Sequence, residues 1–285
     1  MKWSDKMTLK ADLHMHTTSS DGTFTPTELV NHAKKRNIDI ISITDHDTVE
    51  GIDEAIEAAK VVNIKVVPGI ELSTTYNGEN IHIIGYFKGD GYKDDSLINF
   101  LEKLKEKRFT RAMKIVDNMK IIHNINISFE DIMKNSDGVI ARPHIAREIL
   151  KVRPDLTWNQ IFYKFLGDGC PAYIPSVKMS LIDGIKLLKK HGALVSLAHP
   201  TIIKKTPIKK FTEFNFDAIE AIYPENKFGE TGKFISICNE HNLLVTAGSD
   251  FHGNLGQDTM HHDIGTVSLD SSYLENFLEA LDMKL

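Results

Sequence analysis

Short apolar runs alternate with longer amphipathic stretches over the first third of this sequence. Strands are expected at residues 9–13, 38–44, 64–70 and 81–86, and helices at about 26–36 and 52–62. Thr25-Pro26-Thr27-Glu28 is typical of a helix start, because Thr can cap the helix, Pro suits its first position and Glu closes a capping box. Such alternation predicts an α/β fold in which helices cover a parallel sheet.

The pattern changes at about residue 94. A long charged helix is expected at about 94–122, followed by helical segments at 129–134, 142–150 and 156–166. Alternation then resumes with a helix at 181–191, strands at 193–197, 217–222, 243–247 and 264–269, and a closing helix near 272–283. We therefore expect a discontinuous barrel domain, 8–93 and 172–285, that carries an inserted helical lobe at 94–171.

Composition excludes several classes of protein. The 285 residues carry a net charge of −5, which argues against broad coating of nucleic acid but permits a local basic pocket. The two cysteines are isolated, so neither a disulfide framework nor a thiolate zinc site is expected. Neither a secretory signal nor an apolar run approaching the roughly 18 residues of a membrane span is visible. The chain is expected to be cytoplasmic, with no membrane contact.

Histidine and carboxylate side chains gather at six of the expected strands. The loops after the strands of an α/β barrel meet at one mouth, so these side chains should converge. Residues two apart in an extended chain face the same side. His14 and His16 can therefore point at one ion, and so can Asp250 and His252. The candidates are six histidines and three carboxylates: His14, His16, Asp21, His46, Glu71, His82, His199, Asp250 and His252.

Nine ligands are too many for one tetrahedral ion, and they suit two or three metals that share a bridging carboxylate. Imidazole with carboxylate fits Zn, Mn or Fe. Clustered divalent ions lower the pKa of bound water and bind both the attacking and the leaving oxygen. The expected chemistry is therefore metal-assisted hydrolysis of a phosphoester by a metal-bound hydroxide.

Six stretches resemble the motifs of the PHP (polymerase and histidinol phosphatase) family: DLHMHTTSSDGTFTP, ITDHDTVEG, GIELST, IHIIGY, LAHP and GSDFHG. The sequence is most similar to the branch that hydrolyses nucleoside 3′,5′-bisphosphates and degrades short 5′-phosphorylated RNA from its 5′ end. The resemblance implies a distorted (β/α)7 barrel and three divalent ions, usually Mn. It would place His14, His16, Glu71 and Asp250 on one ion, Asp21, His46 and His252 on a second, and Glu71, His82 and His199 on the third.

The same branch carries arginines in an inserted lobe that hold the phosphate that is not cleaved. Arg108 and Arg111 lie three apart on the expected long helix, and Arg142 stands in Ala-Arg-Pro-His. Lys178 is a further candidate for binding this phosphate. Guanidinium groups bind a terminal phosphate with two parallel hydrogen bonds. The expected ligand is a phosphorylated nucleotide or short RNA, with no stable protein partner.

Two other functions remain open at this level. A histidinol-phosphate phosphatase would use the same chemistry on a smaller ester, although a monoester has no second phosphate for the arginines. A non-catalytic PHP module would regulate a partner, although the complete ligand set argues against it. Asp45 and Asp47 flank His46 and either orient imidazoles or stabilise a turn.

Overall fold

The sheet of this protein curls into a nearly closed barrel. The computed structural model describes residues 9–134, 136, 139–175, 178–253, 262–269 and 271–284. The main path of the sheet runs β1-β2-β3-β4-β6-β7-β8, and β5 pairs with β3. The strands are β1 Ala11–Asp12, β2 Ile40–Ile43, β3 Lys65–Tyr76, β4 Glu79–Phe87, β5 Met179–Ser180, β6 Ala193–Leu197, β7 Ala218–Ile222 and β8 Leu244–Ala247. The expected α/β class and distorted barrel are confirmed.

Backbone hydrogen bonds near the ends of β1 and β8 bring the first and last strands together. The N–H of Leu13 donates to Ala247 O at 3.0 Å, and the N–H of His16 donates to Phe251 O at 2.8 Å. Met15 and Phe251 form a parallel bridge. The segments that follow β1 and β8 are therefore adjacent, although more than half of the chain separates them.

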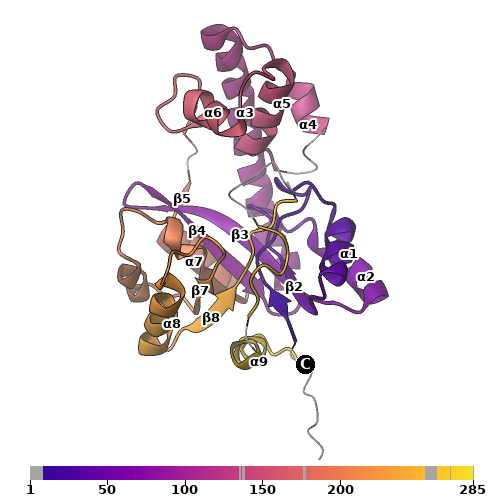
Figure 1. The fold of residues 1–285 in the computed structure, drawn as a ribbon, viewed down its shortest axis with the longest axis vertical. Helices are drawn as coiled ribbons and strands as arrows, with labels where there is room; N and C mark the ends of the chain where they lie inside the picture. The colour runs from indigo at the N-terminus through magenta and orange to yellow at the C-terminus, as the bar shows by residue number, and fades with distance from the viewer. Residues whose placement is uncertain are drawn as a thin grey trace, which may run out of the picture.

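Five helices lie outside the sheet: α1 Pro26–Lys35, α2 Ile52–Val62, α7 Leu181–Lys190, α8 Glu230–His241 and α9 Ser271–Ala280 (Figure 1). The capping box expected at Thr25 and Glu28 is present at the start of α1. Helix α8 had no counterpart in the expectation from sequence. Its Phe234, Ile237 and Cys238 are buried, which is the i, i+3, i+4 spacing of an amphipathic helix.

One strand runs against the expected parallel arrangement. Strand β4 is antiparallel to both β3 and β6, because β3 and β4 form a hairpin. Asn77 (φ 50°) and Gly78 (φ 66°) supply the two positive φ angles of a tight hairpin turn. Strand β3 consequently continues past residue 70 to Tyr76. Glu71 and His82 therefore lie within strands, rather than after strand ends as the sequence suggested.

The prediction of a strand at residues 264–269 is wrong. Gly265 has φ 77°, and the carboxylate of Asp263 accepts the N–H of Ile264, so this segment forms a turn. The N–H of Gly265 donates to Asp12 at 3.0 Å, which draws the turn against the end of β1. Only Leu269 pairs with the barrel, in an isolated bridge to Ala11.

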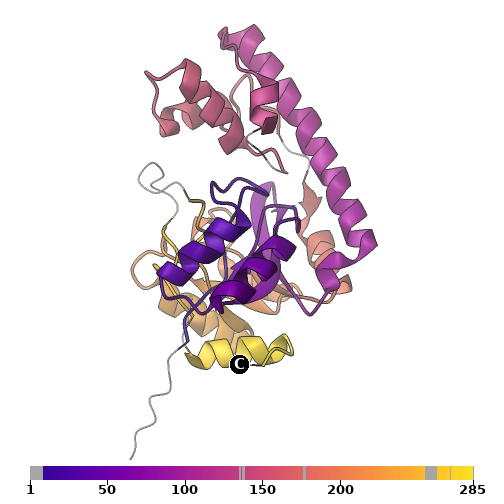
Figure 2. The ribbon, with the colours of Figure 1, turned by 90° about the vertical axis from the view of Figure 1, so that its right-hand side faces the viewer.

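Most of the expected helical insertion lies at one end of the barrel, at the top of Figure 1. It contains α3 Asp95–His123, α4 Phe129–Lys134, α5 Arg142–Val152 and α6 Trp158–Ile161, which continues as a π-helical turn, Phe162–Leu166. Figure 2 shows α3 running beside the barrel and into the lobe. Leu97 and Leu101 of α3 pack in the barrel core, whereas Ala112 and Ile115 pack in a separate core within the lobe. The domain limits 94 and 171 stay a prediction.

Within the described ranges, the structure contains no helix that is both long enough and apolar enough to cross a membrane. Helix α3 has 29 residues, which exceeds the length that a membrane span needs. However, charged side chains recur along its whole length.

Candidate metal centre and substrate cavity

Glu71 lies at the centre of the histidine cluster. Its side chain is fully buried on β3, and its two carboxylate oxygens face different groups. Oε2 lies 2.8 Å from His46 Nδ1, 3.4 Å from His16 Nε2 and 3.5 Å from His14 Nε2. Oε1 lies 3.0 Å from His82 Nδ1 and 2.9 Å from His199 Nε2. A carboxylate in this position can bridge two ions.

His14, His16 and Asp250 form one side of the cluster. The Nε2 atoms of the two histidines lie 3.2 Å apart, as expected for side chains two residues apart in an extended segment. Asp250 Oδ1 lies 3.1 Å from His16 Nε2 and 3.4 Å from His14 Nε2. The N–H of Asp250 donates to His14 O at 2.9 Å, so the closure of the barrel brings these residues together.

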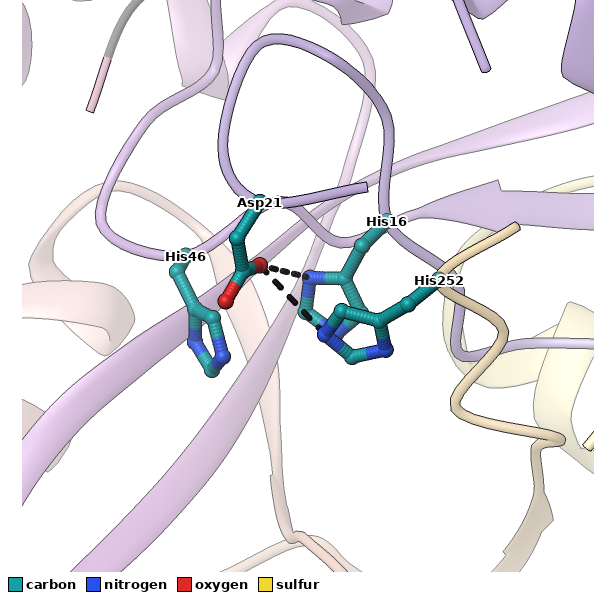
Figure 3. A group of neighbouring side chains, drawn as sticks. All are labelled: His16, Asp21, His46 and His252. Atoms are coloured by element: carbon teal, nitrogen blue, oxygen red, sulfur yellow. Dashed lines mark ion pairs between the residues drawn. The ribbon is translucent and has the colours of Figure 1, made fainter. Parts of the chain in front are cut away.

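Asp21 belongs to a second group, drawn in Figure 3 with His16, His46 and His252. Its Oδ1 lies 3.3 Å from His252 Nε2 and 4.0 Å from His16 Nδ1. The rings of His16 and His252 stack with their centroids 4.1 Å apart. Asp21 comes from the loop between β1 and α1, and His252 follows β8, so the group unites the two ends of the barrel.

All nine residues selected from the sequence come together in this centre. Three sets have candidate ligand atoms within 4.8 Å of one another: His14, His16, Glu71 and Asp250; His16, Asp21, His46 and His252; and His46, Glu71 and His82. The first set equals one of the expected sets. The second adds His16 to the expected three. The third contains His46 in place of His199, which instead contacts Glu71 Oε1.

Several buried donor atoms of the cluster make no hydrogen bond. They are His16 Nδ1, Asp21 Oδ1, His46 Nδ1, Glu71 Oε2 and His199 Nδ1. His46 Nδ1 and Glu71 Oε2 are close enough for electrostatic attraction but are not aligned for a hydrogen bond. Buried polar atoms without partners are costly and require an explanation. Nitrogen and oxygen donors arranged in this way fit divalent transition metals, which would satisfy them.

The pKa shifts within the cluster run in both directions. Burial would lower the pKa values of His14, His46, His199 and His252, but neighbouring carboxylates outweigh it and raise them. Glu71, His16 and His82 instead take the form that binds a metal. Burial alone would raise the pKa of Glu71, but His46, His82 and His14 hold that pKa well below its usual value. Burial lowers the pKa of His16 to about 3, with a further contribution from His252 and His46. Burial also lowers the pKa of His82 to about 4. Ionised carboxylate and neutral imidazole are the forms that bind a metal.

Two residues that support the cluster were missed in the sequence. Glu220 is fully buried on β7, and its Oε1 lies 2.9 Å from His14 Nδ1. Tyr223 Oη donates to Asp250 Oδ2 at 3.1 Å. A signal for Glu220 was present, since a single carboxylate interrupts the apolar strand Ala-Ile-Glu-Ala-Ile, and a buried charge requires a partner.

The contacts of Asp45 and Asp47 decide between the two roles left open for them. Asp45 accepts the N–H of Thr17 at 2.7 Å and the hydroxyl of Ser20 at 2.6 Å, so it stabilises the loop that carries Asp21. Asp47 accepts the N–H of Ser73 at 2.7 Å and pairs with Arg108. Asp45 therefore stabilises a turn. Asp47 instead pairs with Arg108, outside the histidine cluster.

A cavity of about 480 Å³ lies over the histidine cluster. Seven of the nine candidate ligands line it, whereas His14 and His16 lie deeper. The four cations selected from the sequence, Arg108, Arg111, Arg142 and Lys178, line the same cavity. The barrel supplies the ligands, and the lobe supplies the three arginines, so the cavity lies between them.

Each arginine is held by its own contacts. Arg108 pairs with Asp47 and donates to Ser73 Oγ at 3.1 Å. Arg111 Nε donates to Ile174 O at 2.6 Å, and its guanidinium lies 5.1 Å from the Tyr173 ring centroid. Arg142 also lies over this ring, at 5.6 Å. Arg142 Nη1 also donates to Leu166 O at 3.3 Å. The Tyr173 ring and the two carbonyl groups thus fix the guanidinium groups of Arg111 and Arg142 without neutralising their charge.

The cations also affect one another. Burial, reinforced by Arg108 and Arg142, lowers the pKa of Lys178 to about 7. Burial lowers the pKa of Arg108 to about 10. Like charges held together in a partly buried cavity favour the binding of an anion.

Residues 12–157 match the family model described as the PHP domain, which covers just over half of the chain. This chain belongs to the PHP family. The resemblance of its motifs to that family is therefore confirmed. The matched segment contains six of the nine candidate ligands of this PHP chain, together with Arg108, Arg111 and Arg142.

Two relatives align with most of the PHP chain. The 5'-3' exoribonuclease of Haemophilus influenzae is 32% identical over 253 residues, which cover 86% of this chain and 91% of the relative. The 3',5'-nucleoside bisphosphate phosphatase of Chromobacterium violaceum is 30% identical over 261 residues, covering 88% and 90%. Each alignment extends from the barrel through the insertion.

Solved structures share the whole architecture of this PHP chain. A candidate metal-dependent phosphoesterase from Bifidobacterium adolescentis superposes with a TM-score of 0.82 and 25% identity, covering 95% of this chain and 96% of the other. An amidohydrolase from Chromobacterium violaceum, solved with bound sulfate and no metal, gives a TM-score of 0.81 and 27% identity over 95% and 96%. Both superpositions include the inserted lobe, because they cover nearly all of each chain.

Proposed function

We propose that this PHP-family chain is a metal-dependent phosphoesterase that hydrolyses the 3′-side phosphoester of nucleoside 3′,5′-bisphosphates and of short 5′-phosphorylated RNA. One observation carries the proposal. A single cavity is lined by the histidine and carboxylate cluster and by four cationic side chains. A substrate with two phosphates matches both features. The activities in the names of the two aligned relatives support the same conclusion.

The nine clustered residues are the proposed ligands of three divalent ions, of which Mn is the favoured candidate, while Zn and Fe suit the same donors. The list is His14, His16, Asp21, His46, Glu71, His82, His199, Asp250 and His252. Glu71 is the proposed bridge because its two oxygens face different histidines. Divalent ions held there would lower the pKa of a bound water and neutralise charge on the phosphoryl group.

Arg108, Arg111, Arg142 and Lys178 are the proposed binding site for the phosphate that is not cleaved. Their charges face the cavity while carbonyl and aromatic contacts hold the arginines in place. A 5′-phosphate bound there would direct the 3′-phosphoester toward the histidine cluster. A free 3′-phosphate and the first link of an RNA have the same position relative to the 5′-phosphate, so one geometry serves both substrates.

The proposal is tested with purified, Mn-loaded protein and three substrates. Adenosine 3′,5′-bisphosphate and a 5′-phosphorylated oligoribonucleotide should be hydrolysed, and a 5′-hydroxyl oligoribonucleotide should react more slowly because it lacks the phosphate that the cations bind. Inactivity toward all three would refute the proposal. Faster turnover of histidinol phosphate would favour the smaller-substrate alternative. A protein without bound transition metal after gentle purification would favour the non-catalytic module.

A further inference from the structure

A second cavity adjoins the substrate cavity on the side of helix α3. Its volume is about 530 Å³, and Ser73, Arg108, Arg111 and Lys178 line both cavities. None of the nine candidate metal ligands lines the second one. The proposed 5′-phosphate site therefore lies between this second cavity and the histidine cluster.

Two further lysines give the second cavity its charge. Lys107 and Lys114 line it and are exposed on α3, seven residues and about two turns apart. Among the residues that the structure describes, neither lysine takes part in an ion pair. The cavity also contains two carboxylates, but Asp47 is already paired with Arg108. Glu106 is the other, so apart from the Asp47–Arg108 pair the lining has four cations against one carboxylate.

The position of the cavity defines which part of a substrate could reach it. The inference rests on the proposed function, in which the 3′-phosphoester lies at the histidine cluster and the 5′-phosphate lies at the arginines. Downstream RNA is attached to the 3′-phosphoester, so it leaves from the histidine side. Only a group attached to the 5′-phosphate continues past Arg108 and Arg111 into the second cavity.

We propose that the second cavity binds additional phosphates attached to the 5′-phosphate. Nucleotides and RNA with a 5′-diphosphate or 5′-triphosphate are then substrates for the same 3′-side cleavage. Ammonium groups on long side chains suit such a chain of phosphates, because they bind as mobile point charges rather than in one fixed geometry.

The test compares the Lys107→Ala/Lys114→Ala double variant with wild type and with Lys103→Ala. Lys103 is also exposed on α3 but lines neither cavity. The substrates are adenosine 3′,5′-bisphosphate and the matching 5′-diphosphate 3′-phosphate, together with RNA trimers bearing a 5′-monophosphate or a 5′-triphosphate. In the double variant, the ratio of kcat/KM for the polyphosphorylated substrate to that for the monophosphorylated one should fall about tenfold. Lys103→Ala should keep the wild-type ratio.

Inhibition by inorganic tripolyphosphate supplies a second measurement. In the double variant, the ratio of its inhibition constant to that of orthophosphate should rise about tenfold. A wild-type enzyme that cleaves the bisphosphate but not the 5′-diphosphate analogue would overturn the inference and leave the proposed function intact. A loss confined to longer 5′-monophosphorylated RNA would also overturn it, since the lysines would then bind downstream RNA. Inactivity of the wild type toward the bisphosphate would instead refute the proposed function.

Discussion

Glu220 holds His14 in place from the side opposite the cluster. Its Oε1 lies 2.9 Å from His14 Nδ1, while its Oε2 accepts the backbone N–H of His199 at 2.7 Å. If Nδ1–H donates to this carboxylate, the lone pair of Nε2 faces Glu71 and Asp250. Carboxylates behind a metal-binding histidine fix its tautomer and increase its basicity. One carboxylate thus positions two of the proposed ligands.

Glu220→Gln should weaken metal binding roughly 10- to 100-fold, because the amide keeps the shape of the side chain but loses the charge behind His14. Competition with a chromogenic chelator measures the affinity directly and does not require substrate. Glu240→Gln, at an exposed position of α8, is the matched control and should bind metal like the wild type. Equal affinities for all three proteins would show that Glu220 does not position His14.

Gly248→Ala should destabilise the metal-free protein by about 1–3 kcal/mol, the usual cost of overpacking. A Cβ at position 248 would lie 2.1 Å from His14 Cβ and 2.6 Å from Glu220 Oε1, so backbone or side chains must shift. Urea unfolding in the presence of chelator gives the free energy of unfolding. Gly232→Ala in α8 is the control, since a Cβ there meets no atom within 4 Å. It should be neutral or stabilising by about 1 kcal/mol. Similar losses at both positions would contradict the prediction.

Arg111→Ala should raise KM for adenosine 3′,5′-bisphosphate roughly tenfold or more, the range expected for a lost hydrogen bond to a charged group. Hydrolysis of an aryl phosphate should change little, because that substrate has no second phosphate. Arg153→Ala provides the control, since Arg153 pairs with Asp155 in the lobe and lines neither the substrate cavity nor its neighbour. A uniform loss on both substrates would count against the proposed phosphate site.

Lys178 should make substrate binding depend on pH near neutrality. Burial and the neighbouring arginines lower its pKa to about 7, so the ammonium form is lost as the pH rises through 7. KM for the bisphosphate should therefore rise between pH 6 and 8 in the wild type. In Lys178→Met, KM should be higher at pH 6 and approach the wild-type value above pH 8. Parallel KM profiles would show that Lys178 does not contact the phosphate.

The lowered pKa of Lys178 also makes the free energy of unfolding depend on pH. Between pH 7 and the ordinary lysine pKa of about 10.4, the unfolded chain binds a proton that the folded protein has lost. The stability of the wild type relative to Lys178→Met should therefore rise with pH in that window. Urea unfolding of both proteins at pH 7 and pH 9 measures the change, and a relative stability that falls with pH would contradict the assigned pKa.

Several candidate ligands could be selected from sequence because they occupy local positions with a clear rule. His14 and His16 alternate in an extended segment, and His199 lies two residues after the end of β6. Glu220 could not be assigned to His14 in this way, since 206 residues separate them and only the closed barrel brings them together. The apolar residues of 264–269 suggested a strand, but the hydrogen bond from Gly265 to Asp12 outweighs that local preference.

The direction of β4 illustrates a different limit. Asn77-Gly78 is a strong hairpin signal that lies between two apolar segments, and it could have revealed the antiparallel pairing. Regular βαβ alternation instead predicts parallel strands, with Glu71 and His82 at strand ends. Their proximity nevertheless followed, because the hairpin places the two side chains on adjacent strands.

Helix α3 begins in the core of the barrel and ends in the core of the lobe, so one continuous rod carries Arg108 and Arg111 to their positions. Each residue of an α-helix advances the chain by 1.5 Å and rotates it by about 100°. Deleting one residue between Leu101 and Arg108 would turn both guanidiniums out of the cavity. The number of residues in this stretch of α3 would therefore set the distance between the proposed 5′-phosphate site and the histidine cluster.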